Sequence, residues 1–316
     1  MSSPVEILLS TYNGEKYLTI QLESILKQDY SNWKLIIRDD GSKDGTLSII
    51  REYAEKHPGK ILLIKDEEGN MGYSASFSKL LRHSSADYIM YCDQDDYWYP
   101  EKISTMMAAM IVEEITLPVK AHLLFSDVQM VDSEMKVTEQ SFLRRTNYSA
   151  KKGMQIFFLK NYVPGCNMLF NRRLIEQALH TENSIKLHDH WLLLVCSSVG
   201  KISCINKPLM QYRMHDNNAI GFTEANTSLW QKVSLFFKNN LKYGFSNKKY
   251  REVLYSANIR QMQNICECLA ADVSKDAITF SKIDQSNYFR RKIRNITRPY
   301  ICENSLLKQL TYINCF

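Results

Sequence analysis

Apolar runs and amphipathic segments alternate through the first hundred residues of the chain. The apolar runs cover residues 5–10, 33–39, 60–66 and 86–92, and a polar loop follows each of them. Apolar residues then recur near helical spacing, and Pro100 opens the last of these helical segments. Short buried strands that alternate with helices of ordinary length are typical of a parallel α/β sheet. The pattern therefore predicts an α/β fold with a mostly parallel sheet flanked by helices.

The pattern loosens after residue 112 but still indicates regular structure. It predicts a strand with a turn at 121–132, a helix at 150–161, a strand leading into a helix at 167–179, a buried helix at 189–200 and strands at 201–215. Helical spacing continues from about residue 222. We expect a main domain of residues 1–221, with halves of about 1–110 and 111–221, and a small helical region of residues 222–316.

Three polar loops follow predicted strands, at residues 11–14, 39–45 and 93–96. In open α/β sheets, ligands bind beyond the carboxyl ends of the strands. We therefore expect these loops to face one cleft. The first of them reads "STYNGEKY" and lacks the G-x-G-x-x-G of nicotinamide enzymes, so that class is disfavoured.

The composition limits the class of protein. Of 316 residues, 45% are hydrophobic and 23% are charged, which excludes collagen-like and disordered chains. No run of about eighteen apolar residues predicts a transmembrane helix, and the N-terminus is typical of a first strand and not of a signal peptide. We expect a cytoplasmic protein that is soluble or peripheral to a membrane.

Positive charge is concentrated in the C-terminal region. Residues 222–316 carry 15 Lys and Arg against 7 Asp and Glu, and aromatic residues accompany the basic ones at 230–249 and 288–300. This mixture fits the interface of an anionic bilayer, and it equally fits a solvated helical face packed on the main domain. No recognised nucleic-acid module is present, so no nucleic-acid partner is expected.

The stretch "YCDQDDYW" (91–98) places Asp93, Asp95 and Asp96 at the end of a predicted strand. Adjacent carboxylates repel one another and resist burial, and a divalent cation removes both costs. Mg²⁺ or Mn²⁺ suits oxygen ligands and usually completes its shell with phosphate and water. The alternative is that Asp95 and Asp96 cap the next helix and Asp93 ends the strand.

The loop "RDDGSKDGT" (38–46) places Asp39 and Asp40 at the end of another strand. A carboxylate here could accept the imide N–H of uracil or thymine. The alternative is a simple turn, with Asp44 as a helix cap. A turn explains Asp44 but gives no purpose to the paired Asp39 and Asp40.

Other polar residues occur in the second half of the main domain. In "HDHW" (188–191), Asp189 is either a catalytic base or a helix cap, and His188 and His190 are too far apart around a helix to share a zinc ion with His215. Asn167, after a Pro-Gly turn, either lines an acceptor pocket or enters a core strand. Trp98 and Trp191 either stack on sugars or belong to the core.

Several of these motifs, in this order, resemble a known family. The segment "STYNGEKYLTIQLESILKQDYSNWKLIIRDDGSKDGT" with "YCDQDDYW" resembles the inverting, family 2 glycosyltransferases of the Rossmann-like GT-A fold. The segments "PGCNMLFNRRL", "HDHWLLL" and "YRMHDNNAIG" resemble the bacterial rhamnosyltransferase branch. The likeness extends from about residue 4 to 221 and leaves the C-terminal region unassigned.

The resemblance implies a role for each matching residue. The nucleoside would be held by Thr11, Tyr12, Asn13, Asp39 and Asp40. Asp93 would face the ribose or the metal, Asp95 would bind the metal at the diphosphate, and His215 would assist at the metal or diphosphate. Asp189 would be the catalytic base. The donor-sugar or acceptor pocket would include Asp96, Trp98, Asn167, His188, His190, Trp191 and Arg213.

The resemblance also implies a reaction. The protein would use Mn²⁺ or Mg²⁺ to move L-rhamnose from dTDP-rhamnose onto a bacterial cell-surface polysaccharide or its lipid-linked precursor, at the inner face of the plasma membrane. One alternative keeps the fold but uses a UDP-hexose donor such as UDP-glucose or UDP-galactose. Another is a non-catalytic scaffold that docks on the membrane through its basic C-terminal region.

Overall fold

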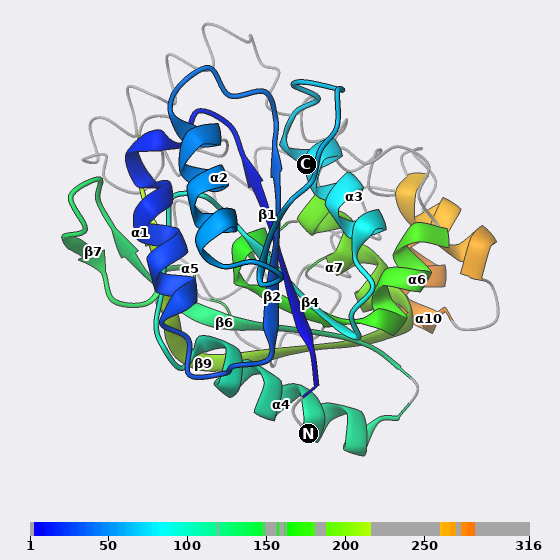
Figure 1. The fold of residues 1–316 in the computed structure, drawn as a ribbon. Helices are drawn as coiled ribbons and strands as arrows, with labels where there is room; N and C mark the ends of the chain where they lie inside the picture. Colours follow the sequence, from blue (N-terminus) through cyan, green and yellow to red (C-terminus); the bar gives the residue numbers. More distant parts are fainter. Residues whose placement is uncertain are drawn as a thin grey trace, which may run out of the picture. The chain divides into compact units, whose positions relative to one another are not determined.

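The computed structural model describes residues 3–118, 120–146, 148, 157, 161, 163–180, 188–215, 260–269 and 273–281. The chain divides into two compact units, residues 1–150 with 160–213, and residues 151–159 with 214–316. Figure 1 shows the arrangement of the elements. The predicted domain boundary at residue 221 lies outside the described residues and stays a prediction.

The first unit is built on a mixed sheet, which has nine strands among the described residues. The strands are β1 (Val5–Thr11), β2 (Trp33–Asp39), β3 (Ile61–Leu63), β4 (Tyr88–Cys92), β5 (Tyr97–Trp98), β6 (Ala121–Val131), β7 (Val137–Glu139), β8 (Met168–Asn171) and β9 (Gly200–Arg213). The helices of this unit are α1 (Glu15–Leu26), α2 (Thr46–Lys56), α3 (Tyr73–His83), α4 (Lys102–Thr116), α5 (Phe142–Thr146), the 3₁₀ turn η3 (Gly165–Asn167), α6 (Arg172–His180) and α7 (His188–Val199).

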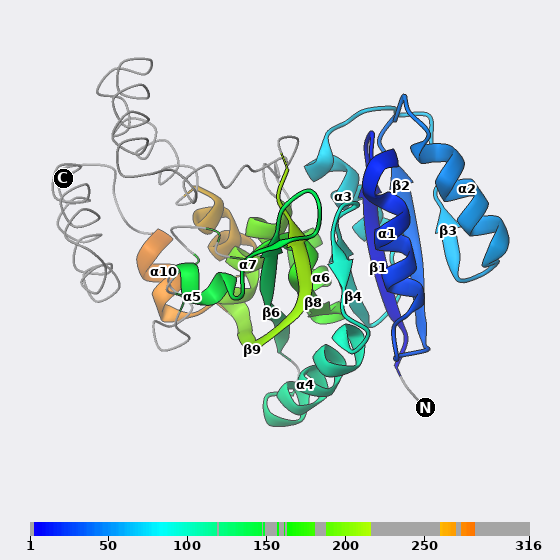
Figure 2. The same cartoon turned by 90° about the vertical axis from the view of Figure 1, so that its left-hand side faces the viewer.

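The strand order is β3-β2-β1-β4-β8-β6-β9-β5, with β7 paired to β6, and Figure 2 shows most of this succession from the side. β1 pairs in parallel with β2 and β4, and β2 with β3, which confirms the parallel arrangement predicted for the first hundred residues. β8 is antiparallel to both β4 and β6, so the sheet reverses direction there. The strands expected at 201–215 are one long strand, β9, whose pairing with β6 shifts register near Asp127.

Apolar side chains on both faces of the central strands form the core. Leu8 and Leu9, on opposite faces of β1, are both fully buried. α1 and α2 lie together on one side of these strands, and α3, α6 and α7 lie on the other side (Figure 1). Strands buried on both faces read as continuous apolar runs, which is why the sequence pattern located them well.

The second unit is described only in part. Residues 260–269 are helical, as is α10 (Lys275–Ser281). Within this unit Gln263 Nε2 donates to the carbonyl of Ser281 at 3.0 Å. The helix expected at 150–161 and the basic segments 230–249 and 288–300 lie outside the described residues. No helix in the described part of the chain is long and apolar enough to cross a membrane.

Candidate active site

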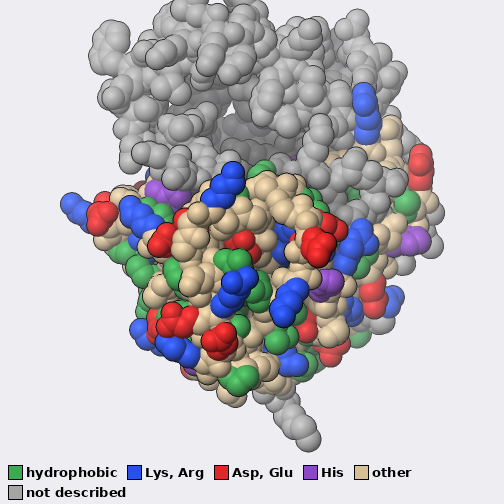
Figure 3. All heavy atoms as spheres, turned by 45° about the horizontal axis from the view of Figure 1, so that its top comes forward, with side chains coloured by type: hydrophobic (Ala, Val, Ile, Leu, Met, Phe, Trp, Pro, Cys, Tyr) green, Lys and Arg blue, Asp and Glu red, His purple; other side chains and the backbone are tan. Residues whose placement is uncertain are grey.

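The loops after β1, β2 and β4 meet at one end of the sheet, as the sequence predicts. Thr11 and Asp39 are register partners at the last step of the β1–β2 pairing, and Asp40 N donates to Thr11 O at 2.7 Å. Beyond them, Asn13 N donates to Ser42 Oγ at 2.9 Å. Figure 3 is turned toward this end of the sheet and shows acidic and basic side chains side by side on the visible face.

Gln94 joins the first and third of these loops. Its Oε1 accepts from Tyr12 N at 2.9 Å, and its Nε2 donates to Tyr12 O at 3.0 Å. A Cβ at Gly14 would overlap the Gln94 amide, so glycine at this position allows the side chain to reach Tyr12. The role of Gln94 does not follow from the sequence, because no local pattern identifies a residue whose hydrogen-bond partner is 82 positions away.

The two aspartates after β2 differ in their surroundings. Asp39 is partly exposed, and it accepts from Thr11 Oγ1 at 2.9 Å and from Ser42 Oγ at 2.6 Å. Asp40 is only 2% exposed. Its carboxylate accepts from Arg38 and from the backbone N–H of Met71 and Gly72.

The Asp40 carboxylate is buried and fixes the loop after β3. Its predicted contact with the nucleoside stays a prediction. Thr11 is also buried, with 1% of its surface exposed, and its Oγ1 donates a hydrogen bond to Asp39. Asp39, Tyr12 and Asn13 keep exposed surface at the loop and stay candidates for the nucleoside contact.

Arg38 is the centre of a buried hydrogen-bond network beneath these loops. Its guanidinium is fully buried and pairs with Asp40 at 2.5 Å and with Asp66 at 2.8 Å. It also donates to the carbonyl of Gly69 at 3.0 Å. The hydrogen bond from Arg38, more than any other effect, lowers the pKa of Asp66 to about 2. Arg38 therefore holds the loop at residues 66–72 in place beside the loop after β2.

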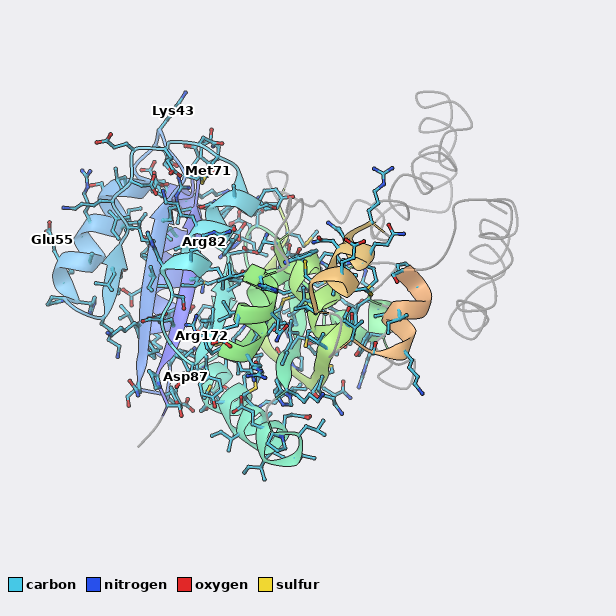
Figure 4. All side chains as sticks on the ribbon, turned by 90° about the vertical axis from the view of Figure 1, so that its right-hand side faces the viewer. Lys43, Glu55, Met71, Arg82, Asp87 and Arg172 are labelled. Carbon is cyan, nitrogen blue, oxygen red and sulfur yellow. The ribbon has the colours of Figure 1, made fainter. Side chains whose placement is uncertain are left out.

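The loop held by Arg38 lies at the site end of the sheet. Figure 4 shows Lys43 and Met71 near one end of the strands and Asp87 and Arg172 near the opposite end. Met71 is 36% exposed, so part of its side chain faces solvent beside the loop after β2. The described surface around Asp39 thus combines polar and apolar side chains, which suits a nucleoside.

The acidic motif after β4 forms a compact cluster with Cys166 of η3. Ligand atoms of Asp93, Asp96 and Cys166 lie within 4.8 Å of one another. Burial, and then repulsion from Asp95, raises the pKa of Asp93 to about 7. Burial, and then repulsion from Asp95 and Asp93, raises the pKa of Asp96 well above its usual range. The charges of the motif therefore destabilise one another, as the sequence predicts.

Asp96 is the most deeply buried carboxylate of this cluster. Its side chain is fully buried, and Oδ1 accepts from Arg213 N at 3.0 Å. Its Oδ2 is buried and has no hydrogen-bond partner among the described residues. Asp96 therefore points into the acidic cluster, and its predicted contact with the donor sugar or acceptor stays a prediction. Asp95 is partly exposed beside it.

Arg213 supports the motif from the end of β9. Its Nε donates to the carbonyl of Asp95 at 2.7 Å, and its Nη1 donates to the carbonyl of Ser133 at 2.9 Å. The guanidinium lies 4.6 Å from the ring centroid of Tyr17. The side chain is 2% exposed, so Arg213 shapes the loop from within, where the sequence analysis expected it in the sugar or acceptor pocket.

A buried lysine lies close to the cluster. Lys102, the first residue of α4, is fully buried. Burial lowers its pKa to about 8, against the attraction of Asp96 and Asp93, which raises it. The sequence analysis missed Lys102 because a lysine in the first turn of a helix usually faces solvent. Its position just after the motif and Pro100 is the one signal that could have indicated it.

Asp189 lies at the start of α7 and is 6% exposed. Asn161 Nδ2 donates to its Oδ2 at 2.7 Å, and the N–H of His190 donates to its Oδ1 at 2.7 Å. A Cβ at Gly165 would lie 3.2 Å from the Asp189 Cβ, so η3 packs directly against the start of α7. Asp189 adds to the repulsion on Asp93, which places it near the acidic motif.

The two histidines beside Asp189 are both buried. The His188 ring stacks on Phe77 with centroids 4.3 Å apart and meets Tyr91 and Tyr73 edge-on. Burial lowers the pKa of His188, so the ring is neutral near pH 7. No group of three metal-binding side chains among the described residues includes either histidine. The predicted roles of both histidines, in the sugar or acceptor pocket and in the surroundings of Asp189, stay predictions.

The remaining pocket candidates belong to the interior of the fold. The Trp98 side chain is fully buried, and the Trp191 side chain is 5% exposed with its Nε1 directed to the carbonyl of Ala178. Asn167 is 1% exposed and hydrogen-bonds Ser126. The predicted sugar stacking by the two tryptophans and the predicted acceptor contact by Asn167 stay predictions. The core alternative that the sequence left open describes all three.

His215 follows β9 and belongs to the second compact unit. It is partly exposed. Its predicted role at the metal or diphosphate stays a prediction.

Comparison with known proteins agrees with this geometry. The model of the family described as glycosyl transferase family 2 matches residues 6–179. The dTDP-rhamnosyl transferase RfbG of Shigella flexneri is 26% identical over 72% of this chain and 78% of that protein. The UDP-Glc:alpha-D-GlcNAc-diphosphoundecaprenol beta-1,3-glucosyltransferase WfgD of Escherichia coli is 25% identical over 64% of this chain and 73% of that protein. A Bacillus subtilis protein named EpsE is 39% identical, but this match covers only 33% of this chain and 37% of EpsE.

Solved structures share the fold at low sequence identity. Staphylococcus aureus TarS 1–349 in complex with UDP has a TM-score of 0.55 at 16% identity, covering 99% of this chain and 78% of that chain. The mannosyltransferase PcManGT from Pyrobaculum calidifontis, solved with GDP-Man and Mn²⁺, has a TM-score of 0.52 at 19% identity, covering 94% and 85%. The GT-A expectation is confirmed, and because the family model matches more than half of the chain, the protein belongs to glycosyl transferase family 2.

Proposed function

We propose that the protein is an inverting, metal-dependent enzyme that moves L-rhamnose from dTDP-rhamnose onto a hydroxyl of a bacterial cell-surface polysaccharide or its lipid-linked precursor. The observation that supports this proposal is that the turn η3 contacts both the acidic motif and Asp189. Cys166 of this turn lies with Asp93 and Asp96, while Gly165 packs against Asp189. One short turn thus brings a candidate cation site and a candidate base into one region.

The residues of the acidic motif fit a hard divalent cation. Asp93 and Asp95 would hold Mn²⁺ or Mg²⁺, and the buried Oδ2 of Asp96 has no partner among the described residues that would compete for it. The Cys166 thiol has its pKa raised by burial and by Asp96 and Asp93, so it keeps its proton and does not favour a soft metal. When bound, the cation supplies Lewis-acid stabilisation for the departing diphosphate.

Asp189 would act on the acceptor. In a single displacement, the acceptor hydroxyl oxygen attacks the anomeric carbon, its proton passes to Asp189, and the bond to the diphosphate breaks with its electron pair. The hydrogen bonds from Asn161 and from the His190 N–H fix the orientation of the carboxylate. The N-terminus of α7 favours the negative charge that a base needs. This route needs no covalent intermediate with the enzyme.

The donor assignment rests on the nucleoside loops and on the relatives. Asp39 would accept the imide N–H of thymine, beside the exposed Tyr12 and Asn13. The similarity to the dTDP-rhamnosyl transferase RfbG supports rhamnose as the sugar. The similarity to the glucosyltransferase WfgD supports a second candidate, UDP-glucose, on the same site.

The acceptor and the place of action belong to the same proposal. A lipid-linked acceptor would be met at the inner face of the plasma membrane, with the enzyme on the cytoplasmic side. The excess of basic residues in 222–316 supports attachment to an anionic bilayer there. His215 would assist at the diphosphate.

Replacing the proposed base tests the mechanism. We expect Asp189→Asn to lower kcat by at least about a thousandfold, because the amide cannot accept the proton, while affinity for the nucleotide sugar stays within about threefold. Single-turnover transfer and equilibrium binding measure the two effects. Asp87→Asn is the matched control, since Asp87 is exposed at the opposite end of the sheet. Near-normal turnover by Asp189→Asn would contradict the assignment.

A panel of nucleotide sugars with Mn²⁺ tests the donor. We expect dTDP-rhamnose to raise the thermal midpoint more than UDP-glucose, UDP-galactose or GDP-mannose does, because only a bound ligand stabilises the fold. A larger effect of UDP-glucose would favour the second candidate. An unchanged midpoint with every nucleotide sugar would contradict the enzyme proposal and leave the scaffold alternative.

A further inference from the structure

Three neighbours of the Lys102 ammonium in the described part of the chain can each accept an N–H or stabilise a positive charge. Its Nζ donates to the carbonyl of Cys166 at 3.1 Å and contacts the Met210 sulfur at 2.9 Å. It also lies 4.3 Å from the ring centroid of Trp98. A carbonyl, a thioether and an indole face together suit the three N–H groups of an ammonium ion.

The acceptors of Lys102 come from three separate elements, β5, η3 and β9, while the lysine itself begins α4. Of these, η3 is the one that carries the cluster, because the Cys166 thiol lies within 4.8 Å of both Asp93 and Asp96. The ammonium thus fixes the backbone of the same residue whose side chain closes the acidic cluster.

The negative charge of the acidic motif gives a physical reason for a lysine at this buried position. A buried ammonium costs several kcal/mol unless an opposite charge compensates it, and the same holds for a buried carboxylate. Lys102 and Asp96 are both fully buried, and each lies in the field of the other. No ion pair within 4.0 Å involves either side chain among the described residues, so each charge acts on the other across a longer distance.

We propose that Lys102 is a positioning residue of the acidic motif, a fixed counter-cation that holds Asp93 and Asp96 close together while no divalent ion is bound. The proposal rests on the proposed function, because it takes the motif as the site of the divalent ion. Its contacts are with the Cys166 carbonyl, the Met210 sulfur and the Trp98 ring, so Lys102 would act through the motif and not on the reacting atoms. Its role is to set the net charge that the ion and the diphosphate encounter.

A fixed positive charge acts in opposite directions on a cation and on an anion. It repels Mn²⁺ and attracts diphosphate, so removing it strengthens binding of the first and weakens binding of the second. Loss of packing alone would weaken both or change neither. The sign of the two changes therefore separates a charge role from a purely structural one.

The experiment compares Lys102→Met and Lys102→Gln, which remove the charge, with Lys102→Arg, which keeps it. Glu6→Gln is the control for loss of stability, because Glu6 is 7% exposed and lies at the start of β1. Mn²⁺ binding is measured on the metal-free full chain at pH 7 from the electron paramagnetic resonance signal of free Mn²⁺. Binding of inorganic pyrophosphate without metal is measured by calorimetry.

We expect both neutral variants to bind Mn²⁺ about tenfold more tightly and pyrophosphate about fivefold more weakly than the unaltered protein. Lys102→Arg and Glu6→Gln should stay within about twofold of it in both assays. A neutral variant that folds only with Mn²⁺ present would also support the proposal, since the ion then replaces the missing ammonium.

Three outcomes would overturn the proposal. One is an unchanged or weaker affinity for Mn²⁺ in both neutral variants while the unaltered protein binds the ion. Another is failure of both variants to fold even with saturating Mn²⁺. If the unaltered protein itself binds no Mn²⁺, the metal-dependent function fails together with this inference, and that result is distinct from the first two.

Discussion

Two buried carboxylates at opposite ends of the sheet have very different surroundings. Glu6, in β1, is 7% exposed and accepts hydrogen bonds from Ser84 Oγ at 2.5 Å, Ser85 N at 2.9 Å and Ala86 N at 3.2 Å. Asp96, after β4, is fully buried, and its Oδ1 accepts from Arg213 N. Its Oδ2 has no hydrogen-bond partner in the described part of the chain.

The difference is the one expected between a structural carboxylate and a carboxylate of the proposed cation site. Hydrogen bonds to a carboxylate replace the water that it loses on burial, and Glu6 receives enough of them. Asp96 has too few, and neighbouring carboxylates raise its pKa further. A site that is short of donors is unfavourable in the empty protein and favourable once a cation is bound. Lys102 reduces this penalty without removing it.

Replacing each carboxylate by its amide is the strongest test of whether Glu6 and Asp96 have different roles. We expect Asp96→Asn to lower kcat/KM by about a hundredfold, because the cation site loses a negative charge. The metal-free fold should be as stable as that of the unaltered protein or more stable. We expect Glu6→Gln to lower the free energy of unfolding by about 2 kcal/mol and to leave kcat unchanged. Urea unfolding with chelator and steady-state transfer assays measure both.

The two substitutions should therefore have crossed effects. If Asp96→Asn were as destabilising as Glu6→Gln in the metal-free protein, the two carboxylates would have the same structural role. The contrast between the two ends of the sheet would then be wrong.

The pH dependence of stability tests the repulsion among the carboxylates of the acidic motif. The pKa of Asp93 is raised to about 7, while an unfolded Asp titrates near 4. Between these values the folded state binds more protons than the unfolded state. The metal-free protein should therefore gain roughly 1 to 2 kcal/mol of stability from this group as the pH falls from 7.5 to 5.5.

Chemical denaturation in chelator at several pH values measures this gain, and Asp93→Asn is the control that should lack it. Saturating Mn²⁺ should reduce the gain, because the bound ion keeps the carboxylate ionised. Equal pH profiles for the unaltered protein and Asp93→Asn would contradict the raised pKa.

A smaller effect is expected at Asp66, which contrasts with Asp93 at the same end of the sheet. The Arg38 hydrogen bond lowers the pKa of Asp66 to about 2, so this carboxylate stabilises the fold above pH 4 and loses that contribution as the pH falls toward 2. Asp66→Asn should cost about 1 kcal/mol at pH 7 and less as the pH approaches 2. Acid unfolding curves of the two proteins should converge; a constant gap would contradict the ion pair with Arg38.

The strands and helices of the first hundred residues follow closely from the sequence. Central parallel strands are buried on both faces, so their apolar runs are continuous and their ends are marked by polar loops. The meeting of the three loops follows from the shared direction of these strands. Residues 201–215 were harder, because polar residues such as Lys207 interrupt the apolar pattern of the single strand β9.

The candidate site follows from the sequence only in part. The acidic motif and Asp189 are marked by their residue types, and the structure brings them together. The burial of Asp40, Trp98 and Asn167 depends on which elements pack over them, and local patterns do not record this. Lys102 and Gln94 act through contacts with distant segments, so no short motif distinguishes them from surface residues.

Gln94 also limits which residue can occupy position 14. Its amide donates to and accepts from the backbone of the same residue, Tyr12, as a neighbouring strand would, and it thereby links the two loops that lie beyond the β1–β4 pairing. Glycine at position 14 leaves the space that the amide occupies. The two positions are therefore sterically coupled: an alanine at 14 would require a shorter residue at 94, and the link between the two loops would disappear.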